Sequence, residues 1–132
     1  MPGSQNSARV QTAKVHDVVK DPGLLPDGST TVLVDRMWPR GVVKDGLAYD
    51  EWFKDVAPSP ELRKWWNHRA EDFDEFAERY RDELSSNDSE ELEKLIGLAE
   101  SGKGPLVLLF AAKDREINHA TVLAQWLGAE LK

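Results

Sequence analysis

Two short apolar runs give the first outline of the fold. Residues Thr30–Asp35 read TTVLVD and residues Leu106–Ala112 read LVLLFAA. Strands that are apolar on both faces are typical of a parallel sheet covered by helices on each side. A third strand is predicted over Arg9–Val18, where β-branched residues alternate weakly with polar ones. Its faces are not cleanly sorted, which favours a position near the edge of the sheet.

Residues 36–105, between the two apolar runs, show helical spacing instead. The clearest stripe repeats at steps of three and four, with acids and arginines between its members: Phe73, Phe76, Tyr80 and Leu84. This spacing places the apolar side chains on one face of an amphipathic helix that should turn towards the core. A last helix is predicted from about Glu116 to Leu127 by a second stripe, which consists of Ile117, Ala120, Leu123, Ala124 and Leu127.

Capping residues indicate where two further helices begin. Ser59 precedes Pro60, and a serine N-cap before a proline in the first turn favours a helix start. Asp88 and Glu91 have the spacing of a capping box, and the helix after them is expected to stop at Gly102. The element order predicts an α/β fold, a small layered sandwich with a mainly parallel sheet of three or more strands and about four helices. The two apolar runs, joined by a long helical crossover, should be parallel neighbours.

Length and composition bound the kind of protein. The 132 residues suit one domain, which we place at residues 9–132 after a flexible tail at residues 1–8. The absence of cysteine excludes disulfides, thiolate zinc sites and a cysteine nucleophile, and it fits a reducing compartment. No apolar run approaches the roughly 18 residues that a membrane span requires. The first residues lack the apolar core of a signal peptide, so the expected location is cytoplasmic, with no membrane association.

The charge is concentrated in one part of the chain. The net charge is −7, and residues 71–100 alone hold 12 acids and 3 bases, a net charge of −9. Such a run is usually a solvated helix face. An acidic protein is also a poor partner for phosphate backbones, so the charge disfavours nucleic-acid binding. The sequence gives no sign of an oligomeric state.

Polar side chains follow directly after both apolar runs. In open α/β sheets, ligands gather beyond the carboxyl ends of parallel strands. If the two strands are parallel, both polar groups emerge at the same edge, and together they form a rim of cations, acids and a histidine. The rim consists of Asp35, Arg36, Trp38 and Arg40 after the first run, and Lys113, Asp114, Asn118 and His119 after the second.

Each of these residues also has a structural interpretation. Asp35 can satisfy backbone amides at the end of its strand. Trp38, held out of the helical region by Pro39, can pack on the core. The remaining alternatives are internal ion pairs for Arg36 and Arg40, a solvated turn and helix cap for Lys113 and Asp114, and a structural hydrogen bond for His119.

Motifs for common chemistry do not occur in the chain. It contains no Walker A motif, no Rossmann glycine triplet, no G-x-S-x-G elbow and no pair of histidines at metal spacing. A metal site on Asp35 and Asp114 would be opposed by the cations beside them. The sequence therefore predicts neither a cofactor nor a metal.

Two functions from different classes remain. In the first, a rim of Arg36, Arg40, Lys113 and Arg63 binds an anionic or phosphorylated small molecule, with Trp38 as a flat face. If a reaction follows, the candidate acids and bases are Asp35, Asp114 and His119. In the second, the chain is a protein-interaction module in which the same arginines form structural ion pairs. Exposed arginine heads that converge on a pocket would favour the first function, and heads buried against Asp35, Asp50 or Asp55 would favour the second.

Four blocks of the sequence resemble a known family. They are VDRMWPRGV, WFKDVAPSPELRKWW, FAERYRDEL and LLFAAKDREINHATVLAQWL. With these blocks the chain, from about Arg9 to Leu127, resembles the YeaO-like proteins, the short bacterial branch of domain-of-unknown-function family 488. The chain departs from the family pattern at Met37, where leucine is common, and at Ile117, where the loop is often more polar.

The resemblance implies a small soluble α/β bacterial protein and no particular reaction. It adds weight to a set of residues that defines the family: Arg36, Trp38, Pro39, Arg40, Arg63, Lys113 and Asp114. Longer relatives carry a cysteine near the last strand. This chain has Ala111 and Ala112 there, so thiol chemistry is not carried over.

Overall fold

A parallel four-stranded sheet forms the centre of the fold. The computed structural model describes residues 10–101 and 104–130, and within them the strands are β1 (Val10–Lys14), β2 (Thr30–Leu33), β3 (Glu51–Trp52) and β4 (Leu106–Phe110). Their order is β1-β4-β2-β3, and every pairing is parallel. β2 and β4 are neighbours, with Thr30 opposite Leu106 and Leu33 opposite Leu109. The predicted parallel pair and the α/β layered class are confirmed.

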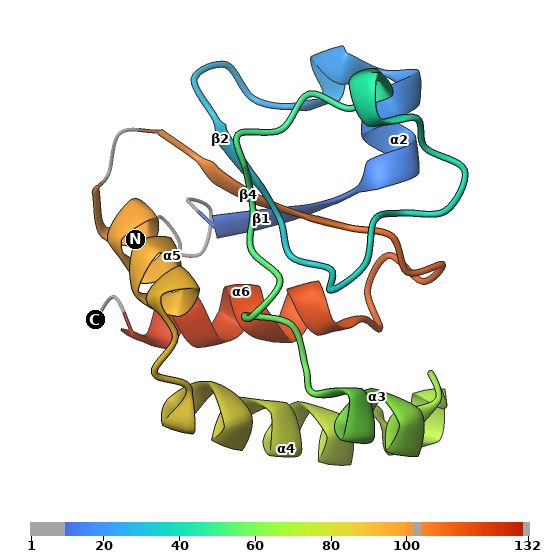
Figure 1. Cartoon of the computed structure of the whole chain (residues 1–132), viewed down its shortest axis with the longest axis vertical. Coiled ribbons are helices and arrows are strands. Elements are labelled where there is room, and N and C mark those ends of the chain that lie inside the picture. The colour runs from blue at the N-terminus through green and yellow to red at the C-terminus, as the bar shows by residue number, and fades with distance from the viewer. Residues whose placement is uncertain (1–9, 102–103, 131–132) are drawn as a thin grey trace.

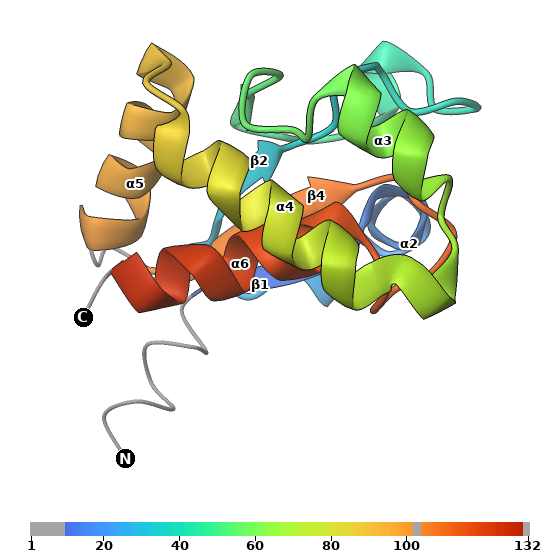
Figure 2. The same ribbon diagram turned by 90° about the horizontal axis from the view of Figure 1, so that it is seen from below.

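The described residues form five α-helices, which are arranged on both sides of the sheet (Figure 1). One face carries α2 (Val15–Lys20), together with a short 3-10 turn at Lys44–Gly46. The other face carries α6 (His119–Glu130), which contacts β1, β4 and α4 (Phe73–Ser86). Figure 2, seen from that side, shows α4 lying across α6, with α3 (Pro60–Trp66) and α5 (Glu90–Ser101) near its two ends.

Alternate residues of β4 enter the two hydrophobic cores. Leu106, Leu108 and Phe110 join the core on the α4 and α6 side, whereas Val107 and Leu109 join the core on the α2 side. All five are buried because helices cover both faces, which explains the unbroken apolar run in the sequence. The predicted stripe on α4 also faces the core, and Phe76, Tyr80 and Leu84 are at most 2% exposed.

The predicted first strand is shorter than expected and ends in a helix. β1 stops at Lys14, and residues from Val15 onwards form α2, whereas a strand was predicted as far as Val18; Arg9 lies outside the described residues. Val15 and Val18 are buried against Leu33 and Val107, and one helical turn places both on the same face. Tertiary packing thus overrides the strand propensity of the valines. The position of β1 at the sheet edge is confirmed.

The predicted helix starts were right once and wrong twice. Ser59 caps α3 through its Oγ, which accepts from the Leu62 amide at 3.1 Å. The cap of α5 is Ser89, not Asp88, and Glu91 instead accepts from the Asp55 amide at 2.6 Å. Gly102, the expected stop of this helix, lies outside the described residues. The last helix begins at His119 rather than Glu116, because the segment before it is a turn.

The short strand β3 was not predicted at all. It consists of Glu51 and Trp52 alone, too few residues to give a period. No helix within the described ranges has the length and apolar character needed to cross a membrane.

Candidate functional site

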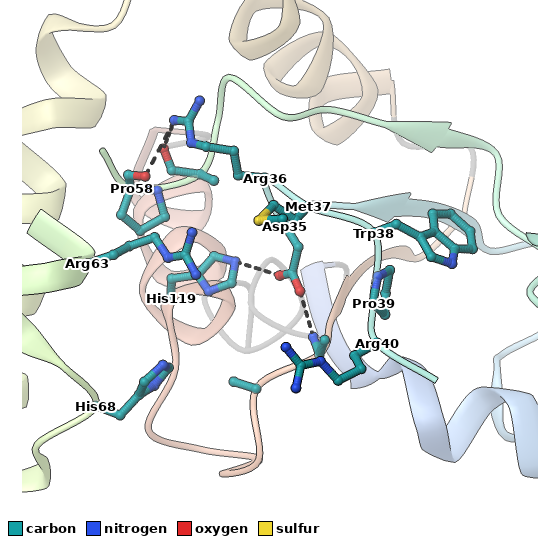
Figure 3. A pocket seen from close by; sticks show the side chains of 13 residues that line it. Asp35, Arg36, Met37, Trp38, Pro39, Arg40, Pro58, Arg63, His68 and His119 are labelled. Atoms are coloured by element: carbon teal, nitrogen blue, oxygen red, sulfur yellow. Dashed lines mark hydrogen bonds and ion pairs between the residues drawn. The ribbon is translucent and has the colours of Figure 1, made fainter. Parts of the chain in front are cut away.

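A pocket of about 250 Å³ lies at the carboxyl edge of the sheet (Figure 3). The loop after β2, the segment around α3, the end of β4 and the start of α6 all contribute to its wall. The lining residues are Asp35, Arg36, Met37, Trp38, Pro39, Arg40, Ala57, Pro58, Arg63, His68, Ala111, Ala112 and His119. The parallel β2–β4 pair therefore brings most of the predicted rim to one place.

Asp35 joins the ends of the two central strands. Its Oδ2 accepts from the Ala111 amide at 3.0 Å, just beyond β4. Its backbone carbonyl accepts from Trp52 Nε1 at 2.7 Å, which attaches β3 to the same point. The Asp35 side chain is 16% exposed, so it still borders the pocket while holding the strand ends together.

His119 lies against the same carboxylate. Its Nε2 is 3.1 Å from the Val34 carbonyl and 3.0 Å from Asp35 Oδ1. Oδ1 is buried and receives no hydrogen bond of good geometry within the described residues, so the ring proton is directed at Val34. The contact with Asp35 is therefore electrostatic, and protonation of the imidazole would strengthen it.

Arg36 is directed away from the interior of the pocket. Figure 3 shows its guanidinium on the far side of Pro58, where Nη2 lies 3.4 Å from both the Ala57 and Pro58 carbonyls. These are long hydrogen bonds to neutral acceptors, and Arg36 forms no ion pair in the described part of the chain. Arg36 thus holds the Ala57–Pro58 segment against the loop after β2.

Arg40 and Arg63 have exposed side chains beside the pocket. They come from different elements, the loop after β2 and helix α3, and both line the same pocket as Asp35 and His119 (Figure 3). Within residues 10–101 and 104–130, neither guanidinium forms an ion pair or a hydrogen bond. Their donors are consequently available to a ligand.

Trp38 anchors the loop by packing. Its Nε1 donates to the Val42 carbonyl at 2.6 Å, and its ring centroid lies 5.6 Å from that of Tyr49 and 5.5 Å from that of Trp52. The Lys44 amine is 5.9 Å from the same ring. In Figure 3 the indole points away from the other lining residues, so the structure does not present it as a flat face to the pocket.

The polar residues after β4 have mostly structural partners. Asp114 Oδ1 accepts from the Glu116 and Ile117 amides, each at 2.8 Å, and these bonds lower the pKa of the carboxyl. Asn118 is fully buried, and its Oδ1 accepts from the Thr121 amide at 2.9 Å. The Glu116, Ile117 and Thr121 amides near the start of α6 therefore already have side-chain acceptors. Lys113 is exposed and borders a neighbouring pocket.

Sequence reasoning missed His68, which lines the pocket opposite His119. The chain leaves α3 through two left-handed residues, Asn67 with φ 49° and His68 with φ 58°. Asn67 caps the helix by donating its amide to the Arg63 carbonyl at 2.9 Å, and the His68 ring lies 5.1 Å from Trp66. Asparagine is a common left-handed helix cap, so the end of α3, and with it His68, could have been predicted.

The described residues contain no group of three or more histidine, aspartate or glutamate side chains close enough to hold a metal ion. The pocket therefore offers cations, two imidazoles and one carboxylate. Guanidinium groups without partners bind anions through paired N–H donors, and this is the chemistry to which the arrangement is best suited.

Comparison with known proteins identifies the family. The sequence model of a family described as the inactive DUF488-N3 subclade matches residues 9–132. The chain belongs to this family. It is 46% identical to the uncharacterised protein YeaO of Escherichia coli over 109 residues, which cover 83% of this chain and 91% of YeaO. It is 44% identical to an uncharacterised protein of Mycobacterium tuberculosis over 120 residues, which cover 91% and 94% of the two chains. No solved structure gives a significant match.

The YeaO-like resemblance of the sequence blocks is thereby confirmed. Both relatives are uncharacterised proteins, so the function of the pocket has to be inferred from its own side chains.

Proposed function

We propose that the pocket binds a small anionic ligand through a phosphate or a similar oxyanion, without chemical turnover. One observation carries the proposal. Arg40 and Arg63 border the same pocket from two elements, and neither guanidinium has a partner among the described residues. Arginine presents N–H donors in pairs that match two oxygens of one phosphate or carboxylate.

The charge balance of the pocket supports an anion. Arg40 and Arg63 contribute two positive charges to its lining, and Asp35 contributes one negative charge, whereas the Arg36 guanidinium is directed away from the interior. These three groups leave an excess of one positive charge, in a chain whose net charge is −7. Like charges in one pocket repel each other, and a bound anion relieves that repulsion. His68 and His119 border the same space and can donate additional hydrogen bonds.

Binding without turnover agrees with the roles of the candidate acids and bases. The Oδ2 atom of Asp35 is committed to the Ala111 amide, and the Nε2 atom of His119 to the Val34 carbonyl. Asp114 lines a different pocket, and its lowered pKa makes it a weak base. The description of the matching subclade as inactive points in the same direction.

The alternative is an interaction module in which the arginines form structural ion pairs. Among the three arginines of the pocket, Arg36 alone has side-chain partners within the described residues, and these are the carbonyls of Ala57 and Pro58 rather than carboxylates. Asp50, one of the suggested partners, instead accepts from the amide and hydroxyl of Thr31. The heads of Arg40 and Arg63 thus have the exposure expected of a ligand site, whereas Arg36 is half-buried.

A thermal-shift series tests the proposal. Phosphate and sulfate, added at constant ionic strength, should raise the midpoint of the wild-type protein in a saturable way, because a ligand that binds only the folded state stabilises it. Arg40→Ala and Arg63→Ala should each remove most of this shift. Arg81→Ala, an equal loss of charge at an exposed position of α4 outside the pocket, is the matched control and should retain the shift. Equal shifts in all four proteins would contradict the proposal.

A further inference from the structure

A second pocket of about 410 Å³ adjoins the first. It lies between the segment after α3 and the loop that joins β4 to α6. Its lining residues are His68, Ala70, Ala112, Lys113, Asp114 and Ile117. His68 and Ala112 also line the arginine pocket, so the two spaces share a wall and adjoin at these residues.

The two pockets differ in chemistry. Ala70, Ala112 and Ile117 give the second pocket an apolar wall, and its two charged residues, Lys113 and Asp114, are opposite in sign. The Asp114 carboxyl has a lowered pKa because the Ile117 and Glu116 amides donate to it, so it remains ionised at neutral pH. With no excess positive charge, this pocket is poorly suited to a second anionic group. It is suited to an uncharged apolar one.

We propose that one ligand occupies both pockets, with its oxyanion at Arg40 and Arg63 and an apolar or aromatic body against Ala70, Ala112 and Ile117. This inference rests on the proposed anion site and narrows its ligand class. The ligand is a phosphate monoester, or a similar ester of an oxyanion, with a body about the size of an aromatic ring or larger. Inorganic phosphate alone would fill only the arginine pocket.

His68 lies where the two parts of such a ligand would join. Among the described residues it is one of the two that line both pockets, and its backbone is held in the left-handed region, a strained conformation for a residue other than glycine. The contact between its ring and that of Trp66 helps to fix the imidazole at this boundary. Strained backbone of this kind is concentrated at binding sites, because the surrounding structure must over-determine it. In the proposed complex, His68 would donate a hydrogen bond to the ester oxygen.

A ligand series tests the inference on the wild-type protein. Isothermal titration with inorganic phosphate, methyl phosphate and phenyl phosphate compares the same oxyanion with increasing apolar bodies. We expect phenyl phosphate to bind about tenfold more tightly than methyl phosphate, which corresponds to ~1.4 kcal/mol. Methyl phosphate should bind much as inorganic phosphate does, because a single methyl group barely enters the second pocket.

Two variants locate the preference. Ile117→Ser removes part of the apolar wall. It should reduce the preference for phenyl over methyl phosphate to about threefold or less, while leaving the affinity for methyl phosphate unchanged. Ile96→Ser is the matched control, because Ile96 is a half-buried residue of α5 that lines neither pocket. This variant should retain the preference of about tenfold for phenyl phosphate.

The outcomes separate this inference from the proposed function. Equal affinity of the wild type for methyl and phenyl phosphate would overturn the two-pocket ligand and leave the anion site intact. A preference that survives in Ile117→Ser and is lost in Ile96→Ser would also overturn it. Failure of all three phosphates to bind would overturn the anion site and the two-pocket ligand together. Equal wild-type affinities would overturn the two-pocket ligand without any variant, so a folding defect in Ile117→Ser cannot hide that outcome.

Discussion

His119 Nε2 lies 3.0 Å from Asp35 Oδ1, and this contact connects the first residue of α6 to the carboxyl end of β2. Through its other oxygen, Asp35 also binds the amide that follows β4. The two residues therefore form the base of the pocket and give the loops around it a fixed support. Arg40 and Arg63 border the same space, so the rigidity of this base limits the entropy that they would lose on binding an anion.

Removal of the Asp35 carboxylate should destabilise the fold. Asp35→Ala leaves the Ala111 amide and His119 without their carboxylate partner, and we expect a loss of about 1–3 kcal/mol in the free energy of unfolding. Asp35→Asn retains an acceptor for the amide and should cost less. Urea denaturation followed by circular dichroism measures both, with Asp45→Ala at an exposed position as the control. An Asp35→Ala midpoint equal to that of the control would contradict the structural role.

Truncation of Trp38 should weaken the loop after β2. The indole packs on Tyr49 and Trp52 and donates to the Val42 carbonyl, so Trp38→Ala should lower the free energy of unfolding by about 3 kcal/mol. Trp38→Phe retains an aromatic ring but loses the hydrogen bond to Val42. It should lower the free energy of unfolding by about 1 kcal/mol, the typical contribution of one hydrogen bond. Denaturant unfolding measures both variants. An unchanged midpoint in Trp38→Ala would mean that the loop does not depend on this packing.

Asp114 should titrate below its ordinary range. The amides of Ile117 and Glu116 lower the pKa of the Asp114 carboxyl in the folded protein. The ionised carboxylate therefore stabilises the fold, and this contribution is fully present at pH values above the ordinary pKa of 3.8. That contribution is lost as the pH falls through the lowered pKa. A carbon-detected NMR titration of the Asp114 carboxyl should give a midpoint below 3.8. The stability difference between wild type and Asp114→Asn should be constant at neutral pH and shrink only in acid. A titration midpoint at or above the ordinary pKa would contradict the role of Asp114 as acceptor of the Glu116 and Ile117 amides.

Sequence patterns predicted the parts of the fold that depend on local chemistry and burial. The unbroken apolar runs gave β2 and β4 because both faces of each strand are covered, and Ser59 before Pro60 gave the start of α3. The helix α2 was missed because the burial of Val15 and Val18 against the sheet is a tertiary effect that their strand propensity does not reveal.

The sequence predicted where the candidate site lies, but it did not predict the directions in which its side chains point. Parallel strands placed Asp35 and His119 at one edge, as expected from topology alone. Arg36 turns to the Ala57 and Pro58 carbonyls, whereas Arg40 remains exposed. The sequence could not reveal this difference, because both arginines lie in the same loop and their directions depend on the path of its backbone and on their side-chain rotamers. His68 enters the site through the left-handed turn after α3, which the spacing of apolar residues does not indicate but the cap residue Asn67 does.

The heat of phosphate binding to the wild type and to the double variant Arg40→Ala/Arg63→Ala tests the central claim most directly. We expect saturable binding of phosphate to one site in the wild type. The affinity of the double variant should be lower by about tenfold or more (a loss of about 1.4 kcal/mol or more), because two charge-assisted contacts are removed. The Arg81→Ala protein should bind as the wild type does. Equal phosphate affinity in the wild type and the double variant, or no saturable heat in the wild type, would contradict the account.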